Sequence, residues 1–234
     1  MSNSKLVNYT KLSPNYSART GAITKITIHH MAGNWSVEQC GNGFSSSTRQ
    51  ASSNYGIGSD GRVGMYVEEK NRAWTSSNRD NDNKAVTIEV ANDGGAPDWH
   101  VSDKAYNKLI DLCVDICKRN GIKKLNYTGT RDGNLTRHNM FTPTSCPGPY
   151  LQGRFPQIAA EVNKRLAQNG AEQKSFLVRV TASTLNVRAG AGIGYKINTV
   201  VKKGEVFTIV DTSGDWGKLK SGAGWINLKY TQRI

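Results

Sequence analysis

The sequence predicts an α/β domain followed by a small all-β domain. Up to about residue 168, β-branched strand segments alternate with amphipathic helical segments, which is typical of an α/β domain. Residues 176–234 carry only short strand segments separated by Gly, Ser and Asp turns, which is typical of a small barrel or sandwich. The length of 234 residues is ample for two domains of unequal size.

Strand segments in the first domain are rich in β-branched residues and bounded by turn residues. Residues 1–22, which precede them, are polar and are expected to form a strap over the surface. Asp60-Gly61 suits the tight turn of a hairpin. The expected strands cover residues 23–30, 54–58, 62–67 and 85–91.

Helices are indicated by apolar residues at helical spacing and by capping residues. Ser36 and Gln39 form a capping-box pattern, so a short helix should follow. Residues 102–120 place their apolar side chains on one face, and Gly121 follows as a C-cap. A last helix is expected over about residues 155–168.

A polar segment without periodicity separates the two domains. The expected division is residues 1–170, a linker over 171–175, and residues 176–234. In the second domain we expect short strands at 177–180, 185–188, 197–201, 206–210, 217–219 and 224–226.

The formal net charge of +13 is spread unevenly along the chain. Residues 1–174 carry 22 basic and 15 acidic residues, or +7, and residues 175–234 carry 9 and 3, or +6. Such a surface attracts polyanions, including nucleic acid and anionic wall polymers. The chain has no basic recognition helix and no stacked-aromatic motif, so nucleic-acid binding is not expected.

Composition also bears on the compartment. The chain has no run of 18 or more apolar residues, so we expect no membrane insertion, and the N-terminus lacks the apolar core of a signal peptide. The protein is therefore expected in the cytosol unless another protein releases it. Four cysteines in such a chain do not predict a disulfide framework, and Cys113 and Cys117 read as small core residues of a helix.

A proline-bent loop carries the residues on which the functional prediction depends. His138 and Cys146 lie on it, eight residues apart, and imidazole and thiolate are ligands that zinc favours. A third ligand is expected from His29 or His30 at the end of the first strand, one of the two because their side chains alternate. An isolated pair would suit a loop histidine and a buried thiol, but the strand-end histidine favours an open His₂Cys zinc site. His100 is expected at the surface.

Three more residues have suitable chemistry for catalysis. Glu89 lies mid-strand, so it either faces water on an edge strand or is buried near the metal as a general base. Tyr55 either belongs to the core or presents its phenol to a developing oxyanion. Thr144 either satisfies a turn or assists at the same oxyanion.

Four motifs in order resemble one enzyme family. They are Ile-Thr-Ile-His-His-Met-Ala, Asn-Tyr-Gly-Ile-Gly with Asp-Gly-Arg-Val, Val-Thr-Ile-Glu-Val, and Arg-His followed by Thr-Ser-Cys-Pro-Gly. Over about residues 20–168 the chain resembles the zinc-dependent type-2 N-acetylmuramoyl-L-alanine amidases, relatives of phage T7 lysozyme and the peptidoglycan recognition proteins. The resemblance implies a mixed central β-sheet flanked by helices. It also implies hydrolysis of the amide bond between N-acetylmuramic acid and L-alanine in peptidoglycan.

The same resemblance implies roles for individual residues. The implied Zn²⁺ ligands are His29, His138 and Cys146. Glu89 becomes the candidate base, and Tyr55 and Thr144 the candidates that stabilise the tetrahedral intermediate. At Thr144 the T7-like enzymes carry lysine and the recognition-protein amidases carry threonine. The second ring nitrogen of His29 should bond to an acceptor that fixes its tautomer.

The second domain resembles the bacterial SH3-type wall-binding module. Its motifs are Thr-Leu-Asn-Val-Arg-Ala-Gly, Lys-Gly-Glu, Asp-Trp-Gly-Lys-Leu and Ala-Gly-Trp-Ile-Asn-Leu-Lys-Tyr, which predict an SH3-like barrel. An amidase fused to such a module is similar to phage endolysins of Gram-positive hosts, which a holin releases to the cell wall, or to a host autolysin. The aromatic residues suited to wall binding are Tyr195, Trp216, Trp225 and Tyr230, of which Trp225 is expected to fill the core.

Three alternatives remain open at this point. A non-catalytic peptidoglycan recognition protein would bind without cleaving, but Cys146 argues against it because such members lack the zinc cysteine. A cysteine peptidase needs a cysteine at a helix N-terminus, whereas Cys40 comes near a C-terminal end. A polyanion-binding protein with structural histidines is supported by the charge alone.

Overall fold

The computed structural model describes residues 2–172 and 175–234. Contacts between Cα atoms divide the chain into two compact units, Met1–Leu166 and Ala167–Ile234, which we treat separately. The linker expected over 171–175 includes residues 173–174, which lie outside the described residues. No helix among the described residues is long and apolar enough to cross a membrane.

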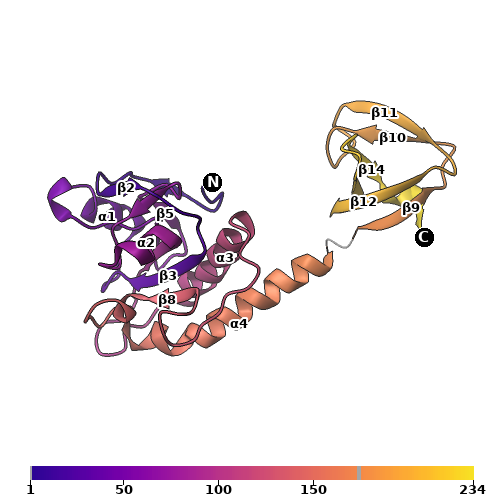
Figure 1. Ribbon diagram of the computed structural model, residues 1–234. Helices are drawn as coiled ribbons and strands as arrows, with labels where there is room; N and C mark the ends of the chain where they lie inside the picture. The colour runs from indigo at the N-terminus through magenta and orange to yellow at the C-terminus, as the bar shows by residue number, and fades with distance from the viewer. Residues whose placement is uncertain (1, 173–174) are drawn as a thin grey trace. The chain divides into compact units, whose positions relative to one another are not determined.

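A mixed six-stranded sheet forms the centre of the N-terminal unit, which confirms the predicted α/β class (Figure 1). Strands β4, β7, β3 and β8 run parallel to one another, whereas β5 is antiparallel to β4 across the predicted Asp60-Gly61 hairpin. The strands, in sheet order, are β1 (Tyr9–Thr10), β5 (Val63–Met65), β4 (Tyr55–Ile57), β7 (Ala85–Val90), β3 (Lys25–His30) and β8 (Leu135–Arg137). Strands β2 (Tyr16–Ala18) and β6 (Asn71–Ala73) form a separate pair.

The α-helices of the described residues all begin in the N-terminal unit. They are α1 (Val37–Gly43), α2 (Arg79–Lys84), α3 (Asp103–Arg119) and α4 (Gly148–Glu172), and two short 3₁₀ turns are η1 (Ser47–Arg49) and η2 (His138–Met140). The capping box of Ser36 and Gln39 is present as predicted at α1. Helix α2 was not predicted, because it is short and polar and begins at an Asn78 cap without apolar periodicity.

Helix α4 is longer than the sequence suggested. It begins at Gly148 rather than near residue 155, and it runs to Glu172, into the segment read as linker. Its start was obscured because Pro149 looks like a helix breaker, although proline is tolerated in the first turn, where its missing N–H has no helical partner. Its end was obscured because polar residues such as Gln168 lack an apolar pattern yet are good helix formers.

The two faces of the central sheet differ in chemistry. On one face, apolar side chains such as Ile26 and Ile28 belong to a single buried core with residues of α3 and α4. On the other face, Thr27 and Thr136 are joined by a 2.9 Å bond between their hydroxyls, and Asn81 donates to Thr27 at 2.9 Å. This second face is therefore held by hydrogen bonds, so polar side chains can be buried on it with partners.

The N-terminal segment does more than cover the surface. Strand β1 extends the edge of the sheet, and the half-buried Arg19 acts as a hub. Its guanidinium donates hydrogen bonds to the backbone carbonyls of Glu69, Asn71, Asp82, Asn83 and Ala85. Burial lowers the pKa of Arg19 to about 10, so the side chain remains charged at neutral pH.

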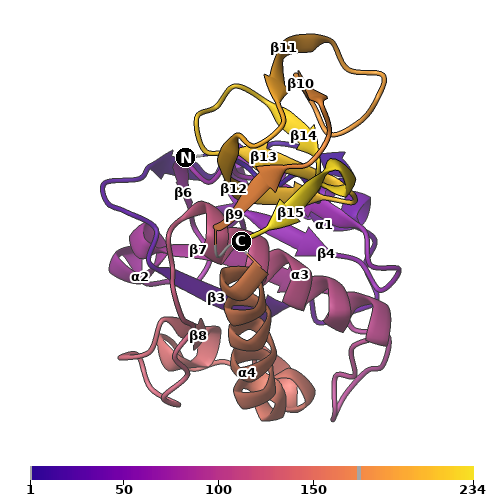
Figure 2. The same cartoon turned by 90° about the vertical axis from the view of Figure 1, so that its right-hand side faces the viewer.

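The C-terminal unit is a seven-stranded antiparallel sheet, in agreement with the predicted all-β domain (Figure 2). In sheet order its strands are β11 (Ile197–Lys202), β10 (Thr184–Arg188), β14 (Trp225–Asn227), β13 (Trp216–Leu219), β12 (Val206–Ser213), β9 (Phe176–Val180) and β15 (Thr231–Arg233), and η3 spans Leu228–Tyr230. The prediction that Trp225 fills the core is wrong. Ile226 is fully buried there, and strand alternation leaves Trp225 half-buried outside the core with Lys218 over its ring.

Substituting Arg19 tests the hub. Arg19→Ala should lower the free energy of unfolding by roughly 2–4 kcal/mol, because it leaves several carbonyls without their charged donor. Arg19→Lys should recover only part of this loss, since an ammonium cannot reach carbonyls on both sides as the planar fork does. Arg62→Ala is the control, because its ion pair with Glu38 is exposed. Urea unfolding measures the difference, and equal effects of Arg19→Ala and Arg62→Ala would contradict the assignment.

Candidate active site

Three side chains converge at the carboxyl end of two neighbouring parallel strands. His29 lies at the end of β3, and His138 follows β8 directly at the start of η2. Cys146 lies just before α4. Because β3 and β8 run parallel, their carboxyl ends lie at the same edge of the sheet, where open α/β sheets place reactive groups.

The three side chains are close enough to share one metal ion. One ligand atom from each of His29, His138 and Cys146 lies within 4.8 Å of the other two. His29 Nδ1 is 3.7 Å from Cys146 Sγ, and the rings of His29 and His138 have centroids 4.6 Å apart. A tetrahedral zinc ion with Zn–N of about 2.0 Å and Zn–S of about 2.3 Å separates nitrogen from sulfur by roughly 3.5 Å.

Unpartnered polar atoms at this point also fit a metal centre. Nε2 of His29, Nε2 of His138 and Oε2 of Glu89 are buried and have no hydrogen-bond partner among the described residues. Buried polar atoms without partners are rare, and a missing ion is one of their usual causes. Two imidazoles and a thiolate with a fourth position open form the donor set of a catalytic zinc site. Neither ring nitrogen of His29 is hydrogen-bonded to an oxygen among the described residues, so the acceptor expected for its second nitrogen is not found there.

Backbone hydrogen bonds close the loop that carries His138 and Cys146. The Asn139 N–H donates to the Cys146 carbonyl at 3.1 Å, which brings the two ends of the loop together. The His30 N–H donates to Cys146 Sγ at 3.4 Å, a contact that favours a thiolate. Gly148 has φ of +82°, and a Cβ there would lie 2.8 Å from Trp99 Cβ, so glycine is required after Pro147.

The other two histidines are outside the ligand cluster, although His30 also lines the groove. His30 points to the opposite face of β3 from His29, where its ring meets Trp99 edge-on at 5.2 Å. His100 is exposed, as expected, and its Nδ1 is 2.6 Å from Asp93 Oδ1. Strand alternation therefore separates His29 from His30 as the sequence predicted.

Burial holds the candidate ligands in uncharged forms while no metal is bound. Desolvation lowers the pKa of His29 well below its usual value, with the neighbouring His138 and His30 adding to the effect. Burial likewise lowers the pKa of His138 and raises that of the Cys146 thiol. Neutral imidazole is the form that binds metal, and a cation at this point would favour the thiolate.

Glu89 is half-buried beside the ligands. In the β3–β7 pair it is the register partner of His29, and its Oε1 lies 3.9 Å from His29 Nδ1. Burial raises the pKa of Glu89 to about 8, and the positive charge of Arg49 opposes this shift. A carboxyl group with a raised pKa next to a candidate metal site has the properties of a general acid–base residue. The alternative of a water-facing edge position does not apply, because β7 lies between β4 and β3.

Tyr55 does not belong to the site, contrary to the role suggested for it. Its fully buried side chain lies on the apolar face, because it pairs in register with Ile88 and not with Glu89. Its hydroxyl donates to Glu69 Oε1 at 2.7 Å and accepts from the Ser4 N–H at 2.9 Å. The phenol is therefore part of a buried network and cannot reach a developing oxyanion. The strand pattern in the sequence did not determine on which face of the sheet the Tyr55 side chain lies.

Thr144 remains at the site. It is exposed and lines the same groove as His138 and Cys146. Its Oγ1 accepts a hydrogen bond from the Cys146 N–H at 3.2 Å, so it does satisfy the turn. This bond uses the hydroxyl as acceptor, and its proton is still available to a substrate oxygen.

Two of the candidate ligands, His138 and Cys146, line a groove of about 480 Å³ together with Glu89. Sequence reasoning missed most of its walls, which come from loops: Trp35, Phe44, Arg49, Ala51, Ser52, Trp74 and Thr75. Trp35 is 44% exposed, and a Cβ on Gly33 or Gly43 would lie 3.0 or 3.2 Å from its ring. The absence of a side chain at Gly33 and Gly43 therefore leaves room for the Trp35 ring. In the sequence, these two glycines on either side of a tryptophan were the available sign of a groove wall.

Cys40 also lines the groove but is a poor nucleophile. It lies in the fourth position of α1 and is buried, and desolvation raises the pKa of its thiol above the usual range. A catalytic cysteine needs a lowered pKa. The geometry thus argues against the cysteine peptidase alternative.

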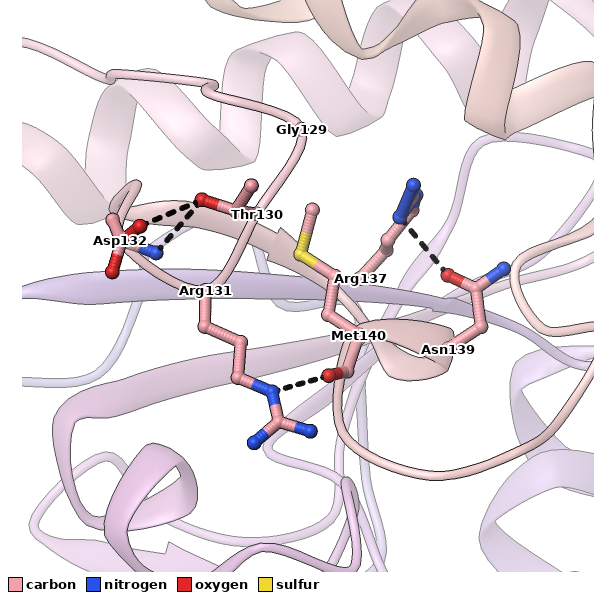
Figure 3. Close-up of a pocket in the computed structure, with 7 residues that line it drawn as sticks. All are labelled: Gly129, Thr130, Arg131, Asp132, Arg137, Asn139 and Met140. Atoms are coloured by element: carbon pink, nitrogen blue, oxygen red, sulfur yellow. Dashed lines mark hydrogen bonds between the residues drawn. The ribbon is translucent and has the colours of Figure 1, made fainter.

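A second cavity, of about 460 Å³, lies beside the ligand loop (Figure 3). Its polar side chains bond within the cavity wall: Arg131 Nε donates to the Met140 carbonyl at 2.5 Å, and Arg137 donates to Asn139 Oδ1 at 3.2 Å. The two guanidinium groups extend to opposite sides of the cavity. The hydrogen bonds of the cavity wall therefore stabilise the loop, and the two arginines do not form one cluster of positive charge.

Comparison with known proteins gives a family for each part of the chain. Residues 19–149 match the family described as N-acetylmuramoyl-L-alanine amidase, and residues 183–232 match the bacterial SH3 domain. A 45-residue stretch is 40% identical to the putative N-acetylmuramoyl-L-alanine amidase YrvJ of Bacillus subtilis (strain 168). That stretch covers 19% of this chain and only 9% of YrvJ.

Solved structures share the fold at low sequence identity. The Staphylococcus aureus hydrolase AmiA in complex with its ligand has a TM-score of 0.56 at 16% identity, covering 73% of this chain and 87% of that one. PlyL has a TM-score of 0.52 at 16% identity, covering 67% of this chain and 96% of that one. The PlyG catalytic domain has a TM-score of 0.52 at 16% identity, covering 67% of this chain and 93% of that one.

The zinc content of His29→Ala and His30→Ala tests which of the two adjacent histidines binds the metal. His29→Ala removes a ligand, so the purified protein should fall from close to one zinc per chain to a small fraction of that. His30→Ala is the matched control, because its side chain lies on the other face, and it should keep most of its zinc. Metal analysis after dialysis measures both. Full zinc in His29→Ala, or equal loss in both variants, would exclude the assigned ligand set.

Proposed function

The chain belongs to the N-acetylmuramoyl-L-alanine amidase family, and on that premise we propose that it is a zinc-dependent enzyme that hydrolyses the bond between N-acetylmuramic acid and L-alanine in peptidoglycan. The observation that carries the proposal is the convergence of His29, His138 and Cys146 next to the half-buried Glu89, at a groove that His138, Cys146 and Glu89 line. A bound zinc ion would supply Lewis acidity at the scissile carbonyl and lower the pKa of the attacking water.

Two side chains of the groove are placed to transfer the proton and to stabilise the developing oxyanion. Glu89, near His29, is placed to accept the proton of the attacking water and to return it to the leaving amine nitrogen. The Thr144 hydroxyl is placed to donate a hydrogen bond to the carbonyl oxygen as negative charge develops there. Trp35, Phe44 and Trp74 give the groove partly apolar walls, next to which electrostatic interactions are stronger than in bulk water.

The C-terminal unit supports a wall-directed role. Because its family is the bacterial SH3 domain, peptidoglycan is the partner that both parts of the chain imply. We infer that this unit holds the enzyme on Gram-positive walls and that the protein acts as a phage endolysin. In that role it is made in the host cytoplasm and released to the wall through a holin. A host autolysin would use the same chemistry.

The two binding alternatives are weaker. A non-catalytic recognition protein has no need of a cysteine in the candidate ligand cluster or of a half-buried carboxyl group beside it, and both are present. If these histidines were structural residues of a polyanion-binding protein, their buried ring nitrogens should have hydrogen-bond partners. One nitrogen of His29 and one of His138 have none among the described residues.

The products released from purified cell walls test the bond that is cut. An amidase should release new N-terminal alanine amines without new reducing sugar ends, and a chelator should stop the release until zinc is restored. Amine labelling and a reducing-sugar assay on the same digest measure both. Reducing ends without alanine amines would identify a glycosidase, and undiminished release in a metal-free sample would end the zinc proposal.

Glu89→Gln tests the proton acceptor. The substitution removes the basic oxygen with little change of shape, so turnover should fall by roughly 10²–10⁴-fold. Zinc content should remain unchanged, because Glu89 is outside the ligand set. Initial rates on soluble muropeptide, with metal analysis of the same sample, give the answer. Near wild-type turnover would make Glu89 structural.

Separated fragments test the division of labour. Residues 176–234 should sediment with Gram-positive walls without cleaving them, and added salt should weaken the ionic part because the Debye length is already about 8 Å at physiological ionic strength. Residues 1–172, which keep α4 whole, should hydrolyse soluble muropeptide but act more slowly on whole cells. A folded C-terminal fragment that binds no wall would refute this division.

A further inference from the structure

We propose that Arg49 binds a carboxylate in the peptide part of the substrate, next to the alanine that carries the scissile amide. The inference rests on the proposed function and adds to it a preference for acidic peptides. The juxtaposition that carries it is an unpaired guanidinium in the same groove as Glu89 and two of the candidate metal ligands, His138 and Cys146.

Arg49 supplies the positively charged side chain of the groove. Among the residues that line it, Arg49 is the only lysine or arginine, and it shares the groove with His138, Cys146 and Glu89. Its guanidinium makes no hydrogen bond or ion pair with any part of the chain that the structure describes. It is near enough to act on the charge of Glu89 but forms no ion pair with it within 4.0 Å. Its charge is therefore available to a ligand.

The backbone under Arg49 is held in place. Arg49 ends the η1 turn, and its N–H donates to the Ser46 carbonyl at 3.1 Å. The Ser46 hydroxyl caps the turn by accepting from the Thr48 N–H at 3.2 Å. The buried Asn15 donates to the same Ser46 carbonyl at 2.8 Å and so ties the turn to the N-terminal segment. A fixed attachment reduces the entropy that an arginine loses when it binds.

The chemistry of the substrate identifies the group that Arg49 meets. Once the lactyl group of the muramic acid is in amide linkage, the sugar side of the scissile bond has no charge, and alanine has only a methyl side chain. The residue after alanine is the first that can carry a carboxylate. A guanidinium binds a carboxylate through two parallel hydrogen bonds, and a groove with partly apolar walls strengthens this pairing.

An alternative role places Arg49 at the reacting carbonyl, where it would stabilise the oxyanion. The two roles differ in what they depend on. A carboxylate-binding residue acts on substrate affinity and only when the carboxylate is present. An oxyanion-binding residue acts on kcat and is indifferent to that carboxylate.

The test uses the full chain with two soluble muramyl peptides that differ only in whether the residue after alanine has a free or an amidated carboxylate. Wild type should show kcat/KM roughly 10–100-fold higher for the free acid, expressed mainly in KM. Arg49→Ala should abolish this preference by losing affinity for the acid alone. Arg49→Lys should keep part of it, because the charge remains without the fork.

Lys70→Ala is the matched control. This exposed lysine pairs with Glu68 and does not line the groove, so the preference should be unchanged. A preference that survives Arg49→Ala, or an equal fall in kcat on both peptides, would overturn the proposal. Titration of the Glu89→Gln protein with the same peptides gives a second measure, the ratio of Kd values. That ratio tests Arg49 even if no hydrolysis occurs, which would count against the proposed function alone.

Discussion

The parallel pairing of β3 with β8 is the constraint from which the rest of the site follows. Its register, Ile26 with Leu135 and Ile28 with Arg137, brings His29 and His138 to the same end of the sheet. The backbone bond from Asn139 to Cys146 then returns the thiol to that point. A slip of one residue in β3 would exchange His29 for His30 and place the wrong ring beside the thiol. The fold therefore defines the candidate metal site through strand register more than through contacts made by the ligands themselves.

The division of the sheet into an apolar and a hydrogen-bonded face explains how this register is kept while charge is buried nearby. Isoleucines and α3 and α4 supply the hydrophobic core on one side. On the other side, threonines such as Thr27 and Thr136 are β-branched and suit a strand, yet their hydroxyls bond to each other. Glu89 lies on this polar face, but its Oε2 has no hydrogen-bond partner among the described residues, and desolvation there raises the pKa of the carboxyl group. The groove above it is built from loops, which accommodate the aromatic walls and Arg49.

Much of this arrangement could be predicted from residues alone, and the exceptions have physical causes. The strand carrying His29, the Asp60-Gly61 hairpin and the α3 helix were recoverable because each has a strong local pattern. Tyr55 was misplaced because alternation gives two faces but does not say which one meets the site; only pairing with Ile88 decides it. The start of α4 was missed because Pro149 has opposite meanings at a first turn and in a helix interior. Arg49 gave no signal, since an arginine in a short polar turn is ordinary until tertiary folding places it in the groove.

X-ray absorption at the zinc K edge of the purified protein tests the central claim most directly. The account predicts one sulfur at about 2.3 Å and two imidazole nitrogens at about 2.0–2.1 Å, with a light atom completing the shell. Cys146→Ser should remove the sulfur component, and Cys40→Ser, a cysteine of the same groove outside the ligand cluster, should leave it intact. A shell without sulfur, or one whose sulfur survives Cys146→Ser, would contradict the assignment of His29, His138 and Cys146 as the ligands.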